Sequence, residues 1–388
     1  MKVVFIVRTN GACDLYRVVQ PLQIAAIQFP QHQFRKLGET ELRTAVGIDE
    51  TKILDLICGA DIIVAPRVWG IKPLLHLRKL NPTAKIVYEY DDNIFHVSPF
   101  SPHYKDYGVD PIDVILPGEK IPRPLWKDGK NINIELNRTT QKETIEGIKD
   151  VEMVTVTTEM LKTVYNRWNS NVVVLPNCVN LKSWQRLPLL PHGGIRMGWF
   201  GGDSHYEDWC ILTEILPKLM NKYSQLKLVL LGAKFDGTLK DINPSQIEHH
   251  PWIDTAAYPL KAASLDLDFG IIPLLKNQFN EGKSAIKFLE LAALKVPSVV
   301  SYVTPYKEIS TEDNGIWIED NDPMAWEEGI SQLVENKLLR SKVADAAYET
   351  VLAKFDAHKN AYMWVESYEN LLRRDPVKLK TEEVANGQ

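Results

Sequence analysis

The sequence predicts a doubly wound α/β fold in two domains. Short β-branched runs alternate with amphipathic segments of helical length, a pattern typical of parallel sheets covered by helices on both faces. With 388 residues, 45% of them hydrophobic, the chain is too long for one ordinary core and holds enough apolar material for two. The alternation also occurs twice, on either side of a segment rich in proline and glycine.

That segment, LPLLPHGG at residues 187–194, is interpreted as the interdomain linker. Before it, strands are expected at residues 2–8, 62–66, 85–90, 153–157 and 172–175. After it, strands are expected at residues 195–200, 227–231, 247–252, 267–272, 298–303 and 316–318. We therefore expect an N-terminal domain over residues 1–190 and a C-terminal domain over residues 191–360. Residues 361–388 would form a helix that returns to the first domain, followed by a flexible tail.

Residues 98–130 break this rhythm with many prolines and charges of both signs. Loops of this length inside compact domains are usually lids, binding loops or linkers. The aromatic residues Phe100, Tyr104, Tyr107 and Trp126 favour a packed loop over disorder. After residue 322 the chain is expected to be helical to about residue 372.

The composition limits which binding partners and which cellular location we expect for the protein. The net charge of −5 gives no overall attraction to the backbone of nucleic acid or to an acidic membrane. The four cysteines lie far apart, without the close pairs of a zinc site or a thioredoxin-like motif. No run of about 18 apolar residues occurs, and the first apolar run is too short for a signal peptide. We therefore expect a cytoplasmic protein.

The segment NEGKSAIKFLELAALKVPSVVS, residues 280–301, is the most informative stretch. Gly282 follows a strand, Ser284 is a natural N-cap, and a helix is expected from about residue 285 to 294. The start of such a helix offers free N–H groups and the positive end of a dipole to an anion, and Lys283 adds a cation suited to a phosphate.

Lys283, Lys287 and Glu290 would share one sector of that helix. One interpretation is a surface ion pair between Lys287 and Glu290. The apolar neighbours of Glu290 in FLELAAL favour a ligand-binding role, because a carboxylate among them must find hydrogen-bond donors such as ribose hydroxyls.

The stretch IVYEYDDNIF, residues 86–95, places Glu89, Asp91 and Asp92 at the carboxyl end of a strand. Neighbouring carboxylates repel one another, so such a cluster is costly unless it binds something. It could accept hydrogen bonds from a sugar, act as a general base for an acceptor hydroxyl, or hold a metal. The metal is the weakest of the three, because no histidine at ligand spacing accompanies the acids. A structural alternative is that Asp92 caps the following turn.

Glycines follow two of the predicted strands. Gly11 lies at the carboxyl edge of the first sheet, where doubly wound folds bind ligands, although no G-x-G-x-x-G fingerprint is present. In IRMGWFGGDSHYEDW, residues 195–209, Gly201 and Gly202 would let backbone amides approach a phosphate closely. A glycine pair is also common in ordinary tight turns.

Residues 280–301, including Pro297 and the strand after it, resemble the donor-binding element of retaining GT-B glycosyltransferases of glycosyltransferase family 4, particularly bacterial and phage members. The resemblance extends along nearly the whole chain. It implies a GT-B fold, with two Rossmann-like domains facing a central cleft. It also implies transfer of a hexose, with retention, from a nucleoside-diphosphate sugar to a hydroxyl acceptor. A UDP-sugar is the favoured co-substrate, and neither a tightly bound cofactor nor a metal is expected.

On this resemblance, Glu290 matches the glutamate that holds the donor ribose. The family's other glutamate would fall at Gly282, and the Lys283-Ser284 pair resembles a variant in which these two residues meet the diphosphate. His205 stands near an expected lysine and no arginine follows the glycines, so Lys283, Lys287 and dipoles must balance the phosphate charge.

Other segments extend the resemblance. Residues 154–184, with Asn177 in an LPN turn, resemble the end of the acceptor domain, and residues 247–258 resemble the segment that reads the nucleobase. Tyr16-Arg17 followed by Pro21 resembles a YR-x-x-x-P signature. Asp91 and Asp92 would face the acceptor. Simpler alternatives are a turn for Asn177, a helix-surface cation for Arg17 and a core position for Trp252.

The expected catalytic residues are Asp91, Asp92, Lys283 and Glu290. The expected donor-binding residues are Gly11, Ala12, Arg17, Gly201, Gly202, Asp203, His205, Trp252, Ile253, Gly282, Ser284 and Lys287. A glycan is the first-ranked acceptor, ahead of a modified DNA base, and lipids and proteins are further acceptors of related chains. Two other functions stay open: a sugar-nucleotide epimerase with the same fold, and a sugar-nucleotide-binding scaffold that has lost catalysis.

Overall fold

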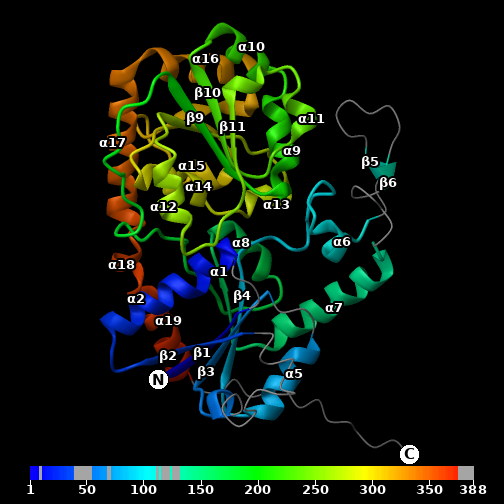
Figure 1. The fold of residues 1–388 in the computed structure, drawn as a ribbon. Helices are drawn as coiled ribbons and strands as arrows, with labels where there is room; N and C mark the ends of the chain where they lie inside the picture. The colour runs from blue at the N-terminus through cyan, green and yellow to red at the C-terminus, as the bar shows by residue number, and fades with distance from the viewer. Residues whose placement is uncertain are drawn as a thin grey trace, which may run out of the picture.

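Two parallel six-stranded sheets organise the chain into two lobes (Figure 1). The computed structural model describes residues 1–7, 11–38, 55–67, 71–110, 113–114, 123–124 and 132–374. Within them, no helix is long and apolar enough to cross a membrane.

The sheet of the first lobe has the strand order β2-β1-β3-β4-β7-β8. Its strands are β1 (Lys2–Val7), β2 (Gln33–Gly38), β3 (Ile62–Pro66), β4 (Lys85–Tyr90), β7 (Met153–Val156) and β8 (Val172–Val174). The five strands predicted before the linker are confirmed, although the last predicted residue of the first strand lies outside the described residues. The edge strand β2 was not predicted, because only Phe34 and Leu37 of its six residues are buried.

Helices cover the first sheet, and the loops at the carboxyl edge of the sheet connect its strands to these helices (Figure 1). They are α1 (Ala12–Asp14), which continues as a π-helical turn (Leu15–Val19), α2 (Gln20–Gln28), α5 (Ile71–Leu80), α6 (Tyr104–Tyr107), α7 (Ile134–Asp150) and α8 (Glu159–Tyr165). The segment predicted as a long packed loop contains α6 and a small antiparallel pair, β5 (Asp113–Val114) and β6 (Arg123–Pro124). Trp126 lies outside the described residues.

The sheet of the second lobe has the order β11-β10-β9-β12-β13-β14. Its strands are β9 (Ile195–Gly201), β10 (Leu226–Gly232), β11 (Ile247–His250), β12 (Phe269–Ile272), β13 (Ser298–Ser301) and β14 (Ile316–Ile318), and all six predictions are confirmed. In chain order this is 3-2-1-4-5-6, so the topological switch point falls between β9 and β12. Ligands of doubly wound sheets bind at the carboxyl ends of the strands beside that point.

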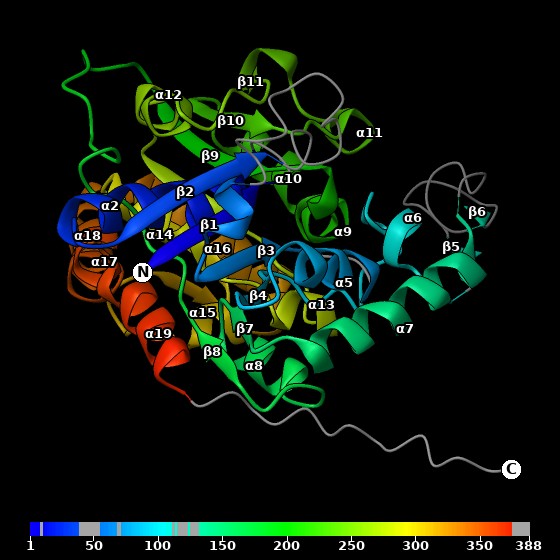
Figure 2. The same cartoon turned by 90° about the horizontal axis from the view of Figure 1, so that it is seen from below.

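The helices of the second lobe include a C-terminal series that confirms the predicted helical region after residue 322. They are α9 (Tyr206–Trp209), α10 (Ile215–Lys222), α11 (Asp236–Leu239), α12 (Tyr258–Ser264), α13 (Gln278–Glu281), α14 (Ile286–Ala293), α15 (Thr304–Lys307), α16 (Pro323–Glu335), α17 (Lys337–Lys354), α18 (Ala357–Asn360) and α19 (Tyr362–Arg373). The last of these, α19, contributes Trp364 and Tyr368 to a buried cluster with Phe5 and Val87 of the first sheet. The view from below shows α19 beside that sheet (Figure 2). The chain therefore crosses between the lobes twice.

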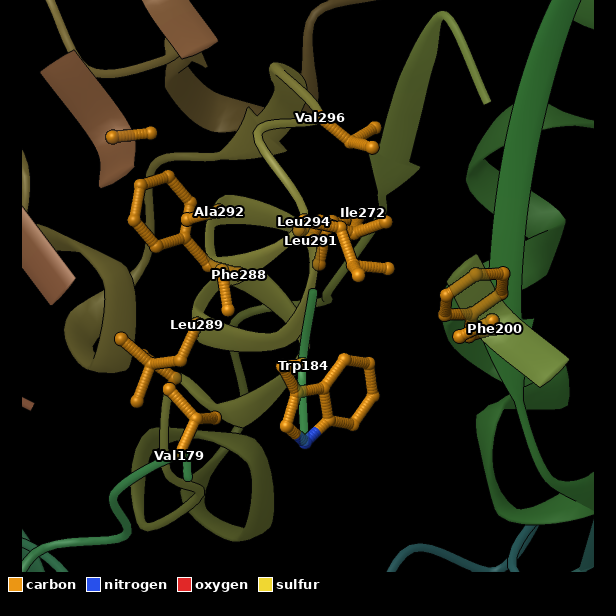
Figure 3. Close-up of a cluster of buried hydrophobic side chains, with 14 of the residues drawn as sticks. Val179, Trp184, Phe200, Ile272, Phe288, Leu289, Leu291, Ala292, Leu294 and Val296 are labelled. Atoms are coloured by element: carbon orange, nitrogen blue, oxygen red, sulfur yellow. The ribbon is translucent and has the colours of Figure 1, made fainter. Parts of the chain in front are cut away.

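A buried apolar cluster fixes the position of α14, the helix that carries the predicted site. Phe288, Leu289 and Leu291 of α14 pack with Ile272 of β12 and with Trp184, which precedes the linker (Figure 3). Because these side chains are almost fully buried, one face of α14 packs into the core and its remaining face is directed to the cleft.

Candidate functional site

A cavity of about 380 Å³ lies between the lobes, at the switch point of the second sheet. The predicted residues that line it are Asp91, Asp92, Gly201, Gly202, His205, Trp252, Lys283, Ser284, Lys287 and Glu290. Among the predicted residues whose side chains are described, Gly11, Arg17, Asp203, Ile253 and Gly282 are outside the lining, and the side chain of Ala12 is not among those described. Most of the expected residues are thus brought together from distant parts of the chain.

Glu290 is buried, with 4% of its surface exposed, and its carboxylate lines the cavity. The hydroxyl of Tyr16 donates to Oε1 at 2.6 Å, and the hydroxyl of Tyr258 donates to Oε2 at 2.8 Å. Burial raises the pKa of Glu290 to about 7, against the opposing effects of the two tyrosines and Lys287. Each carboxylate oxygen can accept a second hydrogen bond, so the group can still receive ligand hydroxyls.

Two lysines face the same cavity from the start of α14. The ammonium of Lys287 lies 5.4 Å from the ring centre of Trp199, and that of Lys283 lies 4.5 Å from the ring centre of Phe279. Burial, with the positive charge of Lys283, lowers the pKa of Lys287 to about 7, although Asp208 and Glu290 oppose the shift. Within the described part of the chain neither lysine forms a salt bridge, so the surface pair between Lys287 and Glu290 is not formed.

The first turn of α14 is open towards the cavity. The predicted N-cap at Ser284 is wrong: Ala285 occupies the cap position and no side chain caps the helix. The hydroxyl of Ser284 instead accepts a hydrogen bond of 2.8 Å from Asn177 of the first lobe. The N-terminal N–H groups of α14 therefore retain their capacity to bind an anion.

His205 lines the cavity beside the two lysines and carries no positive charge at neutral pH. Its Nδ1 lies 2.8 Å from Asp208, whose other oxygen accepts hydrogen bonds from the Leu275 amide and from Asn280, both at 2.8 Å. Burial, together with Lys287 and Lys283, lowers the pKa of His205 to about 3. Because the N–H at Nδ1 donates to the Asp208 carboxylate, Nε2 of the neutral ring can accept a hydrogen bond from a ligand hydroxyl. The positive charge on this side comes from the lysines.

On the opposite wall, Arg67 neutralises the acidic pair. Its guanidinium donates to Asp91 at 2.7 Å and to Asp92 at 3.1 Å, and it also reaches the sulfur of Cys13 at 2.8 Å. Burial alone would raise the pKa of Asp91, but Arg67 outweighs it and the pKa is lowered. The described residues contain no group of three or more metal-type side chains close enough to hold an ion. The carboxylate of Asp92 accepts from Arg67, and in the described part of the chain no turn amide donates to it.

Glu89 and Arg17 form a separate buried pair behind the cavity. Arg17 donates to Glu89 at 2.7 Å and to Asn177 at 3.0 Å, and Thr155 donates to the other oxygen of Glu89. With 2% of its surface exposed, Arg17 is not the helix-surface cation of the simpler interpretation. It instead supports Asn177, which in turn holds Ser284 in the second lobe.

The remaining predicted residues surround the cavity. Gly11 and Ala12 open α1, and Asp203 is exposed in the turn after β9. The carbonyl of Gly282 accepts a hydrogen bond of 3.2 Å from Thr158 of the first lobe. Trp252 is 51% exposed and its neighbour Ile253 40% exposed, so the core position considered for Trp252 is wrong.

Sequence reasoning missed several residues of the lining, namely Arg67, Cys13, His103, Tyr258 and Tyr306. The available signal for Arg67 was its place directly after a buried strand, at the edge where Asp91 also emerges. Its backbone there is left-handed, with φ of 48°, which the sequence does not reveal. The tyrosines gave no signal, because a tyrosine in an apolar segment is ordinarily a core residue.

Comparisons with known proteins agree with this geometry. Residues 195–336 match the sequence model of the family described as Glycosyl transferases group 1. No curated protein matches the sequence.

Solved structures resemble the whole chain. Sucrose-phosphate synthase from Thermosynechococcus elongatus is similar with a TM-score of 0.65 and 14% identity, over 96% of this chain and 99% of that one. Anabaena Alr3699/HepE in complex with UDP and glucose has a TM-score of 0.63 and 12% identity, over 95% and 100%. A glycosyltransferase from Rickettsia africae has a TM-score of 0.63 and 13% identity, over 96% and 99%. The fold is therefore GT-B, and the family match over the second lobe supports a glycosyltransferase.

Proposed function

We propose that the protein transfers a hexose from a nucleoside-diphosphate sugar to a hydroxyl acceptor in the cleft between domains of residues 1–190 and 191–360. The observation that carries the proposal is the arrangement along α14. Three features face one cavity: its first turn, the ammonium groups of Lys283 and Lys287, which have no salt-bridge partner among the described residues, and the buried carboxylate of Glu290. A nucleotide sugar has a diphosphate beside a ribose, and this arrangement matches both.

The donor would lie against the second lobe. Its diphosphate would meet the amides at the start of α14, Lys283 and Lys287, with the Gly201-Gly202 loop close by. The ribose hydroxyls would donate hydrogen bonds to the Glu290 carboxylate, which also accepts from the two tyrosines. The base would lie on the exposed face of Trp252, next to Ile253. UDP is the favoured nucleotide, which the complexes of Anabaena Alr3699/HepE with UDP and UDP-glucose support.

The acceptor would enter over Asp91 and Asp92. Its hydroxyl oxygen forms a bond to the anomeric carbon, the bond from that carbon to the diphosphate oxygen breaks, and the hydroxyl proton passes to the departing diphosphate. Lysines and the helix dipole stabilise the charge that gathers on the leaving diphosphate. The lowered pKa of Asp91 makes it a weak base, so we favour a hydrogen bond donated by the acceptor hydroxyl to the Asp91 carboxylate over proton abstraction. Retention of the anomeric configuration rests on the resemblance to family 4 members.

A donor screen followed by a transfer assay tests the proposal. A thermal-shift screen with UDP-, GDP-, ADP- and dTDP-sugars identifies the donor, because a ligand that binds the native state raises the melting temperature. Release of nucleoside diphosphate is then measured with and without acceptor. Glu290→Ala and Lys283→Ala are each expected to lose most of the transfer activity while remaining folded, and Lys337→Ala on the exposed surface of α17 is the control. Normal turnover by both site variants would refute the assignment.

The same assay separates the other candidates. An isomerised donor without transfer would indicate an epimerase. Donor binding without turnover, across a range of acceptors, would indicate a binding scaffold. A glycan remains the first acceptor to test, because the acidic net charge of the chain disfavours DNA.

A further inference from the structure

A second cavity, of about 470 Å³, opens beside the first and is also built by both lobes. The two cavities are lined by consecutive residues of the same segments: His103 lines the first and Tyr104 the second, while Phe279 lines the first and Gln278 the second. They are therefore neighbours along one cleft. The side chain of Ser98 donates to Glu207 at 2.6 Å across this cavity, which ties its two walls together.

The first lobe gives the second cavity an aromatic wall. Tyr104 and Tyr107 lie three residues apart on α6, and Phe95 packs its ring 4.5 Å from that of Trp168. The hydroxyl of Tyr104 donates to the carbonyl of Asp110 at 2.7 Å, which fixes the ring in place. Faces of aromatic rings carry partial negative charge and attract the C–H edges of a ligand.

The opposite wall of the second cavity is formed by the second lobe and the loop after α6, and it contains polar groups that are available to a ligand. Within the described residues, the side-chain amide of Gln278 and the side-chain Nδ2 of Asn277 have no hydrogen-bond partner. In the same part of the chain, only one carboxylate oxygen of Glu207 accepts a hydrogen bond. The carboxylate of Asp110 lies at the rim. Amides and carboxylates together supply both donors and acceptors, which is what a ligand with many hydroxyl groups requires.

Charge separates the two cavities. The lining of the first has three cations, Arg67, Lys283 and Lys287, beside three carboxylates, whereas the described lining of the second has two carboxylates and neither lysine nor arginine. Burial, with the nearby Arg167, lowers the pKa of His96, so that this side chain adds no cation at neutral pH. In the first cavity Arg67 is paired with Asp91 and Asp92, and the two lysines near the start of α14 remain to attract an anionic diphosphate. The described lining of the second cavity has no such cation and would repel the diphosphate.

We propose that the second cavity binds an uncharged sugar residue of the acceptor, placed against the half-buried rings of Phe95 and Tyr107 and hydrogen-bonded to Glu207 and Gln278. This inference rests on the proposed function and names the substrate class: a neutral glycan, in contrast to one bearing phosphates or uronic acids. The volume is within the range of roughly 300–1,000 Å³ typical of small-molecule sites. Glu207 would select against anionic sugars, because it meets a carboxylate with like charge.

Saturation-transfer NMR on the full chain tests the proposal with simple probes. The neutral probes are the methyl glycosides of glucose, galactose, mannose and N-acetylglucosamine, and the anionic probes are methyl glucuronide and methyl galacturonide. At least one neutral glycoside should bind, with the strongest transfer to the C–H protons of one ring face. Both uronides should bind at least tenfold more weakly. Absence of binding by all four neutral glycosides, or equal binding of a uronide, would overturn the proposal.

Substitutions test whether the glycoside binds in this second cavity. Gln278→Trp fills the space and should abolish glycoside binding, whereas the matched Gln332→Trp on the exposed face of α16 should not. Glu207→Gln should reduce the discrimination against the uronide at least threefold, and Glu349→Gln on α17 should leave it unchanged. Undiminished glycoside binding by Gln278→Trp would contradict the assignment.

Thermal shift with UDP on the same samples distinguishes this proposal from the function on which it rests. UDP binding should be the same in Gln278→Trp and in the unmodified chain. Loss of UDP binding in that variant would make the cavity part of the nucleotide site, and would overturn the inference while the proposed function stands. Glycoside binding by a chain that binds no nucleotide sugar would leave the sugar subsite in place and refute the transferase.

Discussion

The hydroxyl of Tyr16 in the first lobe donates a hydrogen bond of 2.6 Å to the carboxylate of Glu290 in the second. Tyr258 holds the other oxygen at 2.8 Å. One buried carboxylate thus serves both the contact between the lobes and the proposed ribose site. Since hydrogen bonds to a carboxylate favour its charged form, the tyrosines limit the effect of burial, and the pKa settles at about 7.

Replacement of Glu290 by Gln is expected to increase the free energy of unfolding most at high pH. The pKa rises from 4.5 to about 7 on folding, so the contribution of this group to stability is full below pH 4.5 and is lost as the pH rises through about 7. At pH 8 the ionised group costs on the order of 3 kcal/mol relative to an unperturbed carboxyl, and a neutral amide avoids this cost. Urea unfolding at pH 5, 6.5 and 8 measures the difference. A gap between variant and parent that does not widen with pH would contradict the assignment, and Glu349→Gln should show no gap.

Binding of a nucleoside diphosphate is expected to draw a proton onto Lys287. With a pKa of about 7, its amine is largely neutral at pH 8, and an adjacent diphosphate raises the pKa by favouring the charged form. Calorimetric titration with UDP at pH 8, in buffers of different ionisation enthalpy, should give an uptake approaching one proton. Lys287→Met should abolish this uptake and weaken binding at least tenfold, whereas Lys337→Met should retain both. An unchanged uptake in Lys287→Met would assign the proton to another group.

Substitution of Arg67 by Ala is expected to reduce transfer at least tenfold, equivalent to about 1.4 kcal/mol, with little change in donor affinity. Without the guanidinium, Asp91 and Asp92 repel each other and the pKa of Asp91 rises, so the acceptor side is disorganised. Transfer kinetics and UDP titration measure the two effects separately. Arg186→Ala, which removes an exposed arginine, should alter neither. A change confined to donor affinity would place Arg67 in the donor site instead.

Most strands were predictable because they are buried on both faces and appear in the sequence as apolar runs, whereas the mostly exposed edge strand β2 was not. The position of Glu290 was predictable for a related reason, since a carboxylate within FLELAAL has little alternative to burial. Its partners were not, because Tyr16 approaches it from the other lobe, 274 residues away. Arg67 was missed on similar grounds: the pairing with Asp91 depends on the neighbouring positions of β3 and β4, which local sequence does not specify. The sequence alone therefore did not predict the contacts between residues that only the tertiary fold brings together.

Replacement of Arg17 by Met is expected to destabilise the protein by about 3–5 kcal/mol, because Glu89 is left as a buried charge without its partner. The double variant Arg17→Met, Glu89→Gln removes that charge and should recover most of the loss. Full recovery is not expected, since Arg17 also donates to Asn177 and to the carbonyl of Leu175. Urea unfolding of the three chains measures these differences, and Arg78→Met, which breaks half-exposed pairs, should cost less. If the double variant is as unstable as Arg17→Met alone, the contacts to Asn177 and Leu175 outweigh the ion pair. The role of Arg17 would then be to hold the loop that positions Ser284, and donor binding would fall together with stability.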